Sequence, residues 1–167
     1  GALLAILHFL VPDQAWIWAA YAGALAAVNA DTWATEIGVL STSAPRLITS
    51  GRQVEKGTSG GVSLLGTLAV LAGSGWIALL ASFLEPSGSG WLLAGIVLLA
   101  GTAGSTCDSW LGATRQAIYY CPTCQKETER STVHGCGTST RWLRGWRWLN
   151  NDWVNFFCSL AGAGTAS

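Results

Sequence analysis

The sequence predicts an all-α fold, a polytopic transmembrane helix bundle with about four spans, and three observations support this prediction. Half of the 167 residues are hydrophobic and only 11% are charged, whereas a soluble domain usually carries about 25% charged residues. The charges fall in a few short stretches between long uncharged runs. The ten tryptophans are many for this length, and indole rings commonly anchor membrane proteins at the headgroup level.

Four apolar segments are expected to form the helices of a single transmembrane domain that covers residues 1–167. They are residues 14–39, 61–84, 91–114 and 148–163. The second and third are long enough to cross a bilayer, which needs about 20 apolar residues, and the fourth is shorter. The polar run 85–90 predicts a tight turn between the two long segments.

The chain opens on a further apolar run, residues 1–11, which Pro12 and Asp13 bring to an end. At about 1.5 Å per residue this run is too short to span a membrane. We expect it to be the last part of a helix whose start is missing, so that the domain is N-terminally incomplete, or else a re-entrant segment.

The distribution of basic residues predicts the orientation of the bundle. The loop 41–60 contains three basic residues and the loop 115–147 contains six, whereas the 85–90 turn contains none. Because Lys and Arg concentrate in cytoplasmic loops, we expect both basic loops on the cytoplasmic side. The net charge of zero gives no support for nucleic-acid binding.

In this orientation four carboxylates lie at one depth, near the cytoplasmic ends of their helices. They are Asp31, Glu36, Asp108 and Asp152. A carboxylate near the bilayer is costly unless it is paired or hydrated, so such residues are functional candidates by default. Oxygen ligands of this kind suit Mg²⁺, which typically bridges substrate phosphates. The alternative interpretation is that each carboxylate caps a helix or pairs with a nearby arginine.

A glycine-rich segment lies at the same level, just before the second long apolar segment, and is a candidate phosphate-binding loop. Its members are Lys56, Gly57, Thr58, Ser59, Gly60 and Gly61. Glycines allow a phosphate to approach the backbone closely, and the N–H groups at the start of the next helix attract anions. The spacing is not that of a Walker loop, and an ordinary hydrophilic turn is the alternative.

The loop 115–147 contains a pattern of metal ligands. Cys121 and Cys124 form a Cys-x2-Cys pair, and His134 and Cys136 follow within twelve residues. Four such ligands predict a structural, tetrahedral zinc knuckle. A disulfide is the alternative, but a cytoplasmic loop disfavours it.

Several blocks of the sequence together resemble a known membrane family. The blocks are NADTWATEIG, PRLITSGRQVEKGTSGGVSLLGT, GSTCDSWLGAT, HGCGT and NNDWVN, which lie between Asn29 and Asn155. They are similar to the family that contains transmembrane protein 19 and the plant phytyl-phosphate kinases. The resemblance implies an enzyme that transfers a phosphoryl group from CTP or another nucleoside triphosphate to an isoprenyl monophosphate, such as phytyl or geranylgeranyl phosphate.

The resemblance also suggests roles for the candidate residues in such a Mg²⁺-dependent lipid-phosphate kinase. Asp31, Glu36, Asp108 and Asp152 would hold Mg²⁺, while Lys56 and the loop 57–61 would cradle the nucleotide phosphates. Further polar contacts would come from Arg52, Arg115, Asn151 and Asn155. The isoprenyl tail would lie among the helices and membrane lipids.

Two alternatives from other functional classes remain open at this point. A non-catalytic subunit that packs against partner subunits in a larger membrane complex would also be apolar and rich in tryptophan. A transporter could use the intramembrane carboxylates, although the polar loops are more typical of a catalytic face.

Overall fold

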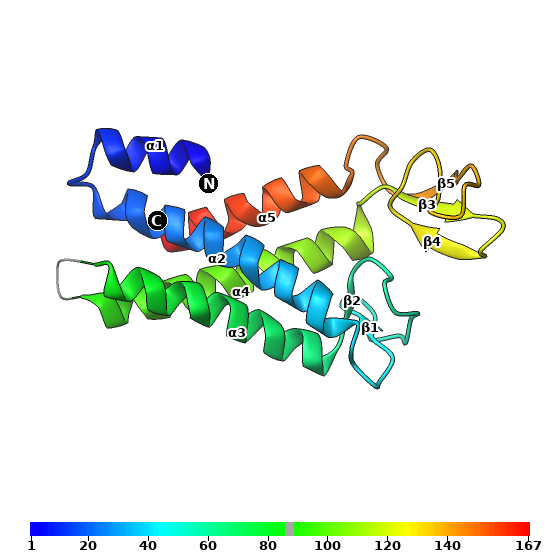
Figure 1. Cartoon of the computed structure of the whole chain (residues 1–167), viewed down its shortest axis with the longest axis horizontal. Coiled ribbons are helices and arrows are strands. Elements are labelled where there is room, and N and C mark those ends of the chain that lie inside the picture. Colours follow the sequence, from blue (N-terminus) through cyan, green and yellow to red (C-terminus); the bar gives the residue numbers. More distant parts are fainter. Residues whose placement is uncertain (86–88) are drawn as a thin grey trace.

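The computed structural model describes residues 1–85 and 89–167 and is an elongated helix bundle with two small sheets at one end (Figure 1). The five helices are α1 (Ala2–Leu10), α2 (Ala15–Gly38), α3 (Leu64–Phe83), α4 (Gly90–Thr114) and α5 (Asn151–Ala166). The five strands are β1 (Arg46–Leu47), β2 (Gly61–Val62), β3 (Ile118–Cys121), β4 (Lys126–Thr128) and β5 (Arg141–Arg144). The predicted turn at 85–90 lies partly outside the described residues.

The helices form close to where the apolar segments predict them, and α1 folds back beside α2 (Figure 1). Of the four expected spans, α3 and α4 are long and apolar enough to cross a membrane by length and composition. α5 has 16 residues, which is fewer than the roughly 20 needed to span. The structure therefore supports a mostly helical fold with two candidate spans, and the four-span topology stays a prediction.

Small residues allow the helices to approach one another closely. α2 packs against α3, α4 and α5, and α4 also packs against α3 and α5. Ala26 and Ala27 of α2 are fully buried, and a methyl group at Gly104 of α4 would collide with Ala27, while one at Gly101 would collide with Ser74 of α3. Alanine and glycine at such contacts are typical of helix packing in membranes, where backbones gain dispersion energy by close approach.

Large apolar side chains cover the outside of the long helices. Leu64 and Phe83 of α3 and Trp91 and Leu99 of α4 are mostly exposed. A soluble protein rarely exposes so many large apolar groups on neighbouring helices. This surface is what a helix bundle in contact with lipid requires.

Two short antiparallel sheets depart from the all-α prediction. β1 pairs with β2, with Arg46 opposite Val62, and the second sheet has the order β4-β3-β5. Each strand has only two to four residues, so the two-residue alternation that identifies a strand in sequence is too short to recognise. Both sheets lie at the end of the bundle where α2 and α4 finish and α5 begins (Figure 1).

The loop that joins β1 to β2 docks on the C-terminal end of α4. Gly60 has φ +79, and a methyl group there would collide with the backbone of Ala113. Ser59 Oγ donates a 2.6 Å hydrogen bond to Oε1 of the buried Gln116. From the second sheet, Arg144 Nη1 donates to the carbonyls of Gly112 and Ala113, at 3.3 Å each. These contacts fix both sheets to the same helix end.

An aromatic cluster continues from the second sheet into α5. Trp146 stacks on Trp148 with ring centroids 5.7 Å apart, Trp148 contacts Trp153, and Trp153 contacts Phe156. All four side chains are about half exposed. Such a cluster at the end of an apolar helix is suited to the headgroup region of a bilayer.

The substitution Gly60→Ala tests the docking of the loop on α4. It should lower the free energy of unfolding by about 2–4 kcal/mol, because it adds both an unfavourable positive φ and a steric collision. Gly57→Ala is the matched control: its φ is +86, but nothing lies within 4 Å of the added methyl group. Denaturant unfolding in mild detergent measures both, and equal losses would show that the loop does not pack as described.

Candidate functional site

Two of the predicted carboxylates come together between α2 and α4. Asp31 and Asp108 interact electrostatically across the contact of these helices. Ser105 Oγ lies 3.5 Å from Asp31 Oδ1, within reach of a weak hydrogen bond. Asp108 Oδ2 is buried and has no hydrogen-bond partner among the described residues. A buried, unsatisfied carboxylate oxygen is costly, and a bound cation is one way to satisfy it.

The positions of the two carboxylates follow from the close approach of the helices. Asp31 is four residues after Ala27, and Asp108 is four residues after Gly104, which packs against Ala27. Both helices run toward the sheet end of the bundle (Figure 1). One helical turn beyond the tight contact therefore places the two carboxylates at the same level of the α2–α4 contact.

The other two predicted carboxylates lie apart from this pair. Glu36 is exposed near the end of α2, and Asp152 is exposed in the first turn of α5. Within the described part of the chain, neither makes a hydrogen bond or ion pair to Asp31 or Asp108. Their assignment as Mg²⁺ ligands remains a prediction.

Glu129 is a third acidic neighbour that the sequence analysis did not identify. It follows β4 and interacts electrostatically with both Asp31 and Asp108. Glu129 lies in the loop that was predicted to bind a metal, and its place near the helices depends on how the second sheet docks on α4. No local pattern in the sequence indicates that Glu129 lies near Asp31 and Asp108.

The glycine-rich loop is only partly open. Gly57 and Thr58 line a cleft, whereas Ser59 and Gly60 are engaged in the contact with α4. Lys56 Nζ lies 3.3 Å from the carbonyl oxygen of Val39, to which it donates at the end of α2. The start of α3 is capped, because Ser63 Oγ accepts from Gly66 N at 3.0 Å. The N–H groups of α3 are thus less available to an anion than the sequence suggested.

The cleft beside this loop has a volume of about 1050 Å³ and opens between the two sheets. Its walls carry four basic and two acidic side chains together with aromatic and aliphatic surface. Among the lining residues are Arg52, Lys56, Ala113, Tyr120, Lys126 and Arg144. Ala113 is five residues beyond Asp108, so the floor of the cleft lies about 7.5 Å further along the helix axis.

The remaining predicted polar contacts lie outside this lining. Arg115 stacks its guanidinium over the ring of Trp146, 5.1 Å from the centroid. Asn151 is the first residue of α5, and Asn155 is exposed one turn later. The cap of α5 is Asn150, whose Oδ1 accepts from Trp153 N at 3.1 Å. None of these contacts bears on a phosphate site, so the roles of Arg115, Asn151 and Asn155 stay predictions.

The four predicted metal ligands come together in the second sheet. One donor atom from each of Cys121, Cys124, His134 and Cys136 lies within 4.8 Å of all the others. The Sγ atoms of Cys121 and Cys136 are 3.6 Å apart, close to the roughly 3.8 Å expected for two thiolates on one tetrahedral zinc. The cluster can hold a metal ion, and three sulfurs and one imidazole form a set that suits zinc.

Hydrogen bonds differentiate the thiols of this cluster. Contacts with Thr138 and His134 lower the pKa of Cys136 to about 5, while the hydrogen bond with Cys136 raises the pKa of Cys124 to about 11. The low pKa of Cys136 favours its thiolate, the form that binds a metal. Metal binding has to displace the proton of Cys124, so the affinity for metal should increase with pH.

The substitution Cys124→Ser tests the metal site. It should reduce bound zinc from about one ion per chain to almost none, because three ligands hold a structural zinc far more weakly than four. Cys107→Ser is the matched control, since Cys107 lies in α4 away from the cluster. Elemental analysis of the purified protein measures both, and equal zinc in the two variants would contradict the assignment.

Comparisons with known proteins place the chain among membrane proteins. A family model described as "Integral membrane protein DUF92" matches residues 1–163. The chain is similar to Protein PGR of Arabidopsis thaliana, with 37% identity over 147 residues, covering 83% of this chain and 49% of that protein. It is also similar to an uncharacterized membrane protein of Methanocaldococcus jannaschii, with 39% identity over 112 residues, covering 67% of this chain and 44% of that protein.

These matches confirm the family resemblance drawn from the sequence blocks. The chain spans about half the length of the curated relatives it matches. No solved structure matches it.

Proposed function

Because this chain belongs to the DUF92 family of integral membrane proteins, we propose that it forms the catalytic part of a lipid-phosphate kinase. The reaction is phosphoryl transfer from CTP or another nucleoside triphosphate to an isoprenyl monophosphate at the cytoplasmic face. A bond forms between an oxygen of the acceptor phosphate and the γ-phosphorus, while the bond to the β-phosphate oxygen breaks. The products are an isoprenyl diphosphate and a nucleoside diphosphate.

The observation that carries this proposal is that a pair of partly buried carboxylates and a basic cleft lie at the same end of an apolar bundle. Asp31 and Asp108 lie within the helices, and the cleft begins at Ala113, further along α4. Phosphoryl transfer depends mainly on positioning and on the neutralisation of phosphate charge. Carboxylates that hold a cation would supply the neutralisation, and the cationic side chains of the cleft would help to position the phosphates.

Asp31 and Asp108 are the side chains best placed to hold Mg²⁺, and the negative charge of Glu129 acts on both of them. Oδ2 of Asp108 is buried without a hydrogen-bond partner among the described residues. This favours the assignment, because a bound cation would satisfy that oxygen. Mg²⁺ held by these residues would supply positive charge that offsets the negative charge of the phosphates. Lys56, Gly57 and Thr58 line the cleft in positions suited to the donor phosphates.

The acceptor would enter from the membrane. Exposed apolar side chains along the helices, such as Leu99 of α4, offer a surface for an isoprenyl tail within the bilayer. The acceptor phosphate would then lie at the headgroup level, near the ends of α2 and α4. Because that phosphate is already an anion, no general base is required to activate it.

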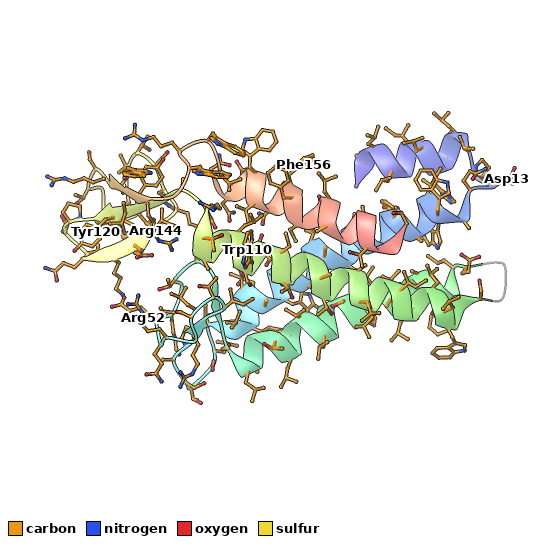
Figure 2. The ribbon with its side chains drawn as sticks, turned by 180° about the vertical axis from the view of Figure 1, so that it is seen from behind. Asp13, Arg52, Trp110, Tyr120, Arg144 and Phe156 are labelled. Atoms are coloured by element: carbon orange, nitrogen blue, oxygen red, sulfur yellow. The ribbon has the colours of Figure 1, made fainter. Side chains whose placement is uncertain are left out.

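An assay of Asp108→Asn tests the proposal. The full-length protein in membranes is incubated with phytyl or geranylgeranyl phosphate, Mg²⁺ and γ-labelled CTP or ATP, and labelled isoprenyl diphosphate is measured. Loss of a carboxylate that holds the cation should lower the rate on the order of a hundredfold or more. Asp13→Asn should retain full activity, since Asp13 is exposed at the opposite end of the bundle (Figure 2).

Two results would contradict different parts of the proposal. No labelled diphosphate from any pairing of lipid and nucleotide, with the protein folded, would contradict the kinase function. Equal rates in Asp108→Asn and Asp13→Asn would leave the function intact and contradict the site.

A further inference from the structure

The cleft has two walls that come from distant parts of the chain. One wall is the stretch 52–58 with its neighbours, and the other consists of Tyr120 of β3, residues 125–127 and Arg144 of β5. Figure 2 shows Arg52 on the loop side and Tyr120 and Arg144 on the sheet side. The second wall is therefore built from the same small sheet that holds the metal-binding cluster.

Each wall contributes one cation that is not used within the protein. Arg144 is engaged with Glu127 at 3.5 Å and with carbonyls of α4, and Lys56 donates to Val39. The side chains of Arg52 and Lys126 make no hydrogen bond or ion pair to any residue that the structure describes. Two unpaired cations that face the same cleft attract a ligand with several negative charges.

The rest of the lining suits a ligand with a flat, apolar part. Tyr120 is partly buried, and Val54 and Leu143 add aliphatic surface. Aromatic side chains stack on nucleobases of any identity. The volume of about 1050 Å³ is at the upper end of the range of roughly 300–1,000 Å³ for small-molecule sites, enough for a base, a ribose and a chain of phosphates.

Two of the predicted metal ligands are direct sequence neighbours of residues that form this wall. Tyr120 directly precedes Cys121, and Gln125 and Lys126 directly follow Cys124. Gln125 has φ 54, a left-handed conformation that is unfavourable for a residue with a side chain. All the cysteines are free thiols, so a bound metal would be the cross-link that holds this turn and the wall beside it.

We propose that the nucleoside triphosphate binds between the two walls, with its phosphates on Arg52 and Lys126 and its base on Tyr120, and that metal occupancy of the Cys/His cluster sets its affinity. This inference rests on the proposed function, from which it takes a nucleotide donor. It assigns to the metal-binding sheet a direct part in holding that donor.

Nucleotide binding to the full-length protein in lipid nanodiscs tests the contacts without any turnover. CTP and ATP are each titrated by calorimetry in the absence of a lipid acceptor. Lys126→Ala and Arg52→Ala should each weaken the tighter-binding nucleotide about tenfold, because each removes a charge-assisted contact to phosphate. Arg130→Ala is the matched control, since Arg130 is an exposed cation near β4 that does not line the cleft.

Two features of this design keep the test decisive. Arg52 is not part of the second sheet, so Arg52→Ala reports on the cleft even if Lys126→Ala disturbs the sheet. Affinities of Arg52→Ala and Lys126→Ala equal to that of Arg130→Ala would overturn the assignment of the phosphates.

Removal of the metal tests the coupling. Protein stripped with a chelator, and then freed of it, should bind the nucleotide about tenfold more weakly, since the wall that contains Tyr120 and Lys126 loses its cross-link. Addition of ZnCl₂ alone should restore the affinity in the wild type but not in Cys124→Ser. Unchanged affinity in the stripped protein, with zinc shown to be absent, would overturn the coupling.

The outcomes also separate this inference from the proposed function. Nucleotide binding that depends on Lys126 without any phosphoryl transfer would overturn the kinase and leave the inference standing. Phosphoryl transfer by Lys126→Ala with an unchanged KM for the nucleotide would support the kinase function and overturn the inference about nucleotide binding. A folded, metal-loaded protein that binds neither nucleotide and transfers nothing would overturn both.

Discussion

The close contact between α2 and α4 is the constraint on which the rest of the structure depends. At Gly104 there is no room for a side chain, because Ala27 fills the space. One turn further toward the sheets, Asp31 and Asp108 lie close enough to interact electrostatically. A larger residue at the tight contact would move the two helices, and with them the two carboxylates, apart. A packing requirement in the apolar part of the bundle thus determines the chemistry available at its polar end.

The C-terminal end of α4 serves as the platform for everything outside the bundle. The loop that contains Gly60 rests on Ala113, and Arg144 donates to the carbonyls of Gly112 and Ala113. Gly145 is required at the same place, because a methyl group there would collide with the backbone of Gln116. Cations near a helix C-terminus also interact favourably with its dipole. The cleft is therefore held between two segments that share one support.

The sequence predicted the parts of this arrangement that are encoded locally. Long apolar runs indicated α2, α3 and α4, and the spacing of Cys121, Cys124, His134 and Cys136 indicated the metal-capable cluster that the structure brings together. The sheets were missed because their strands have only two to four residues, too few for an alternating pattern to be recognised. Glu129 and Tyr120 were missed for a different reason, since each becomes relevant only when the second sheet docks beside α4. Lys56 was identified by its charge, but its contact with Val39 could not be foreseen.

The docking of Gly60 on Ala113 has a consequence for the biosynthesis of the protein. The loop leaves the ribosome before α4 does, and during that interval it has no surface on which to rest. Its left-handed glycine and the hydroxyl of Ser59 find their partners only after α3 and α4 have both been made and the chain has returned to the same end of the bundle. The order of synthesis therefore delays the assembly of the cleft until the helical core already exists, so that an unfinished chain has no complete cleft.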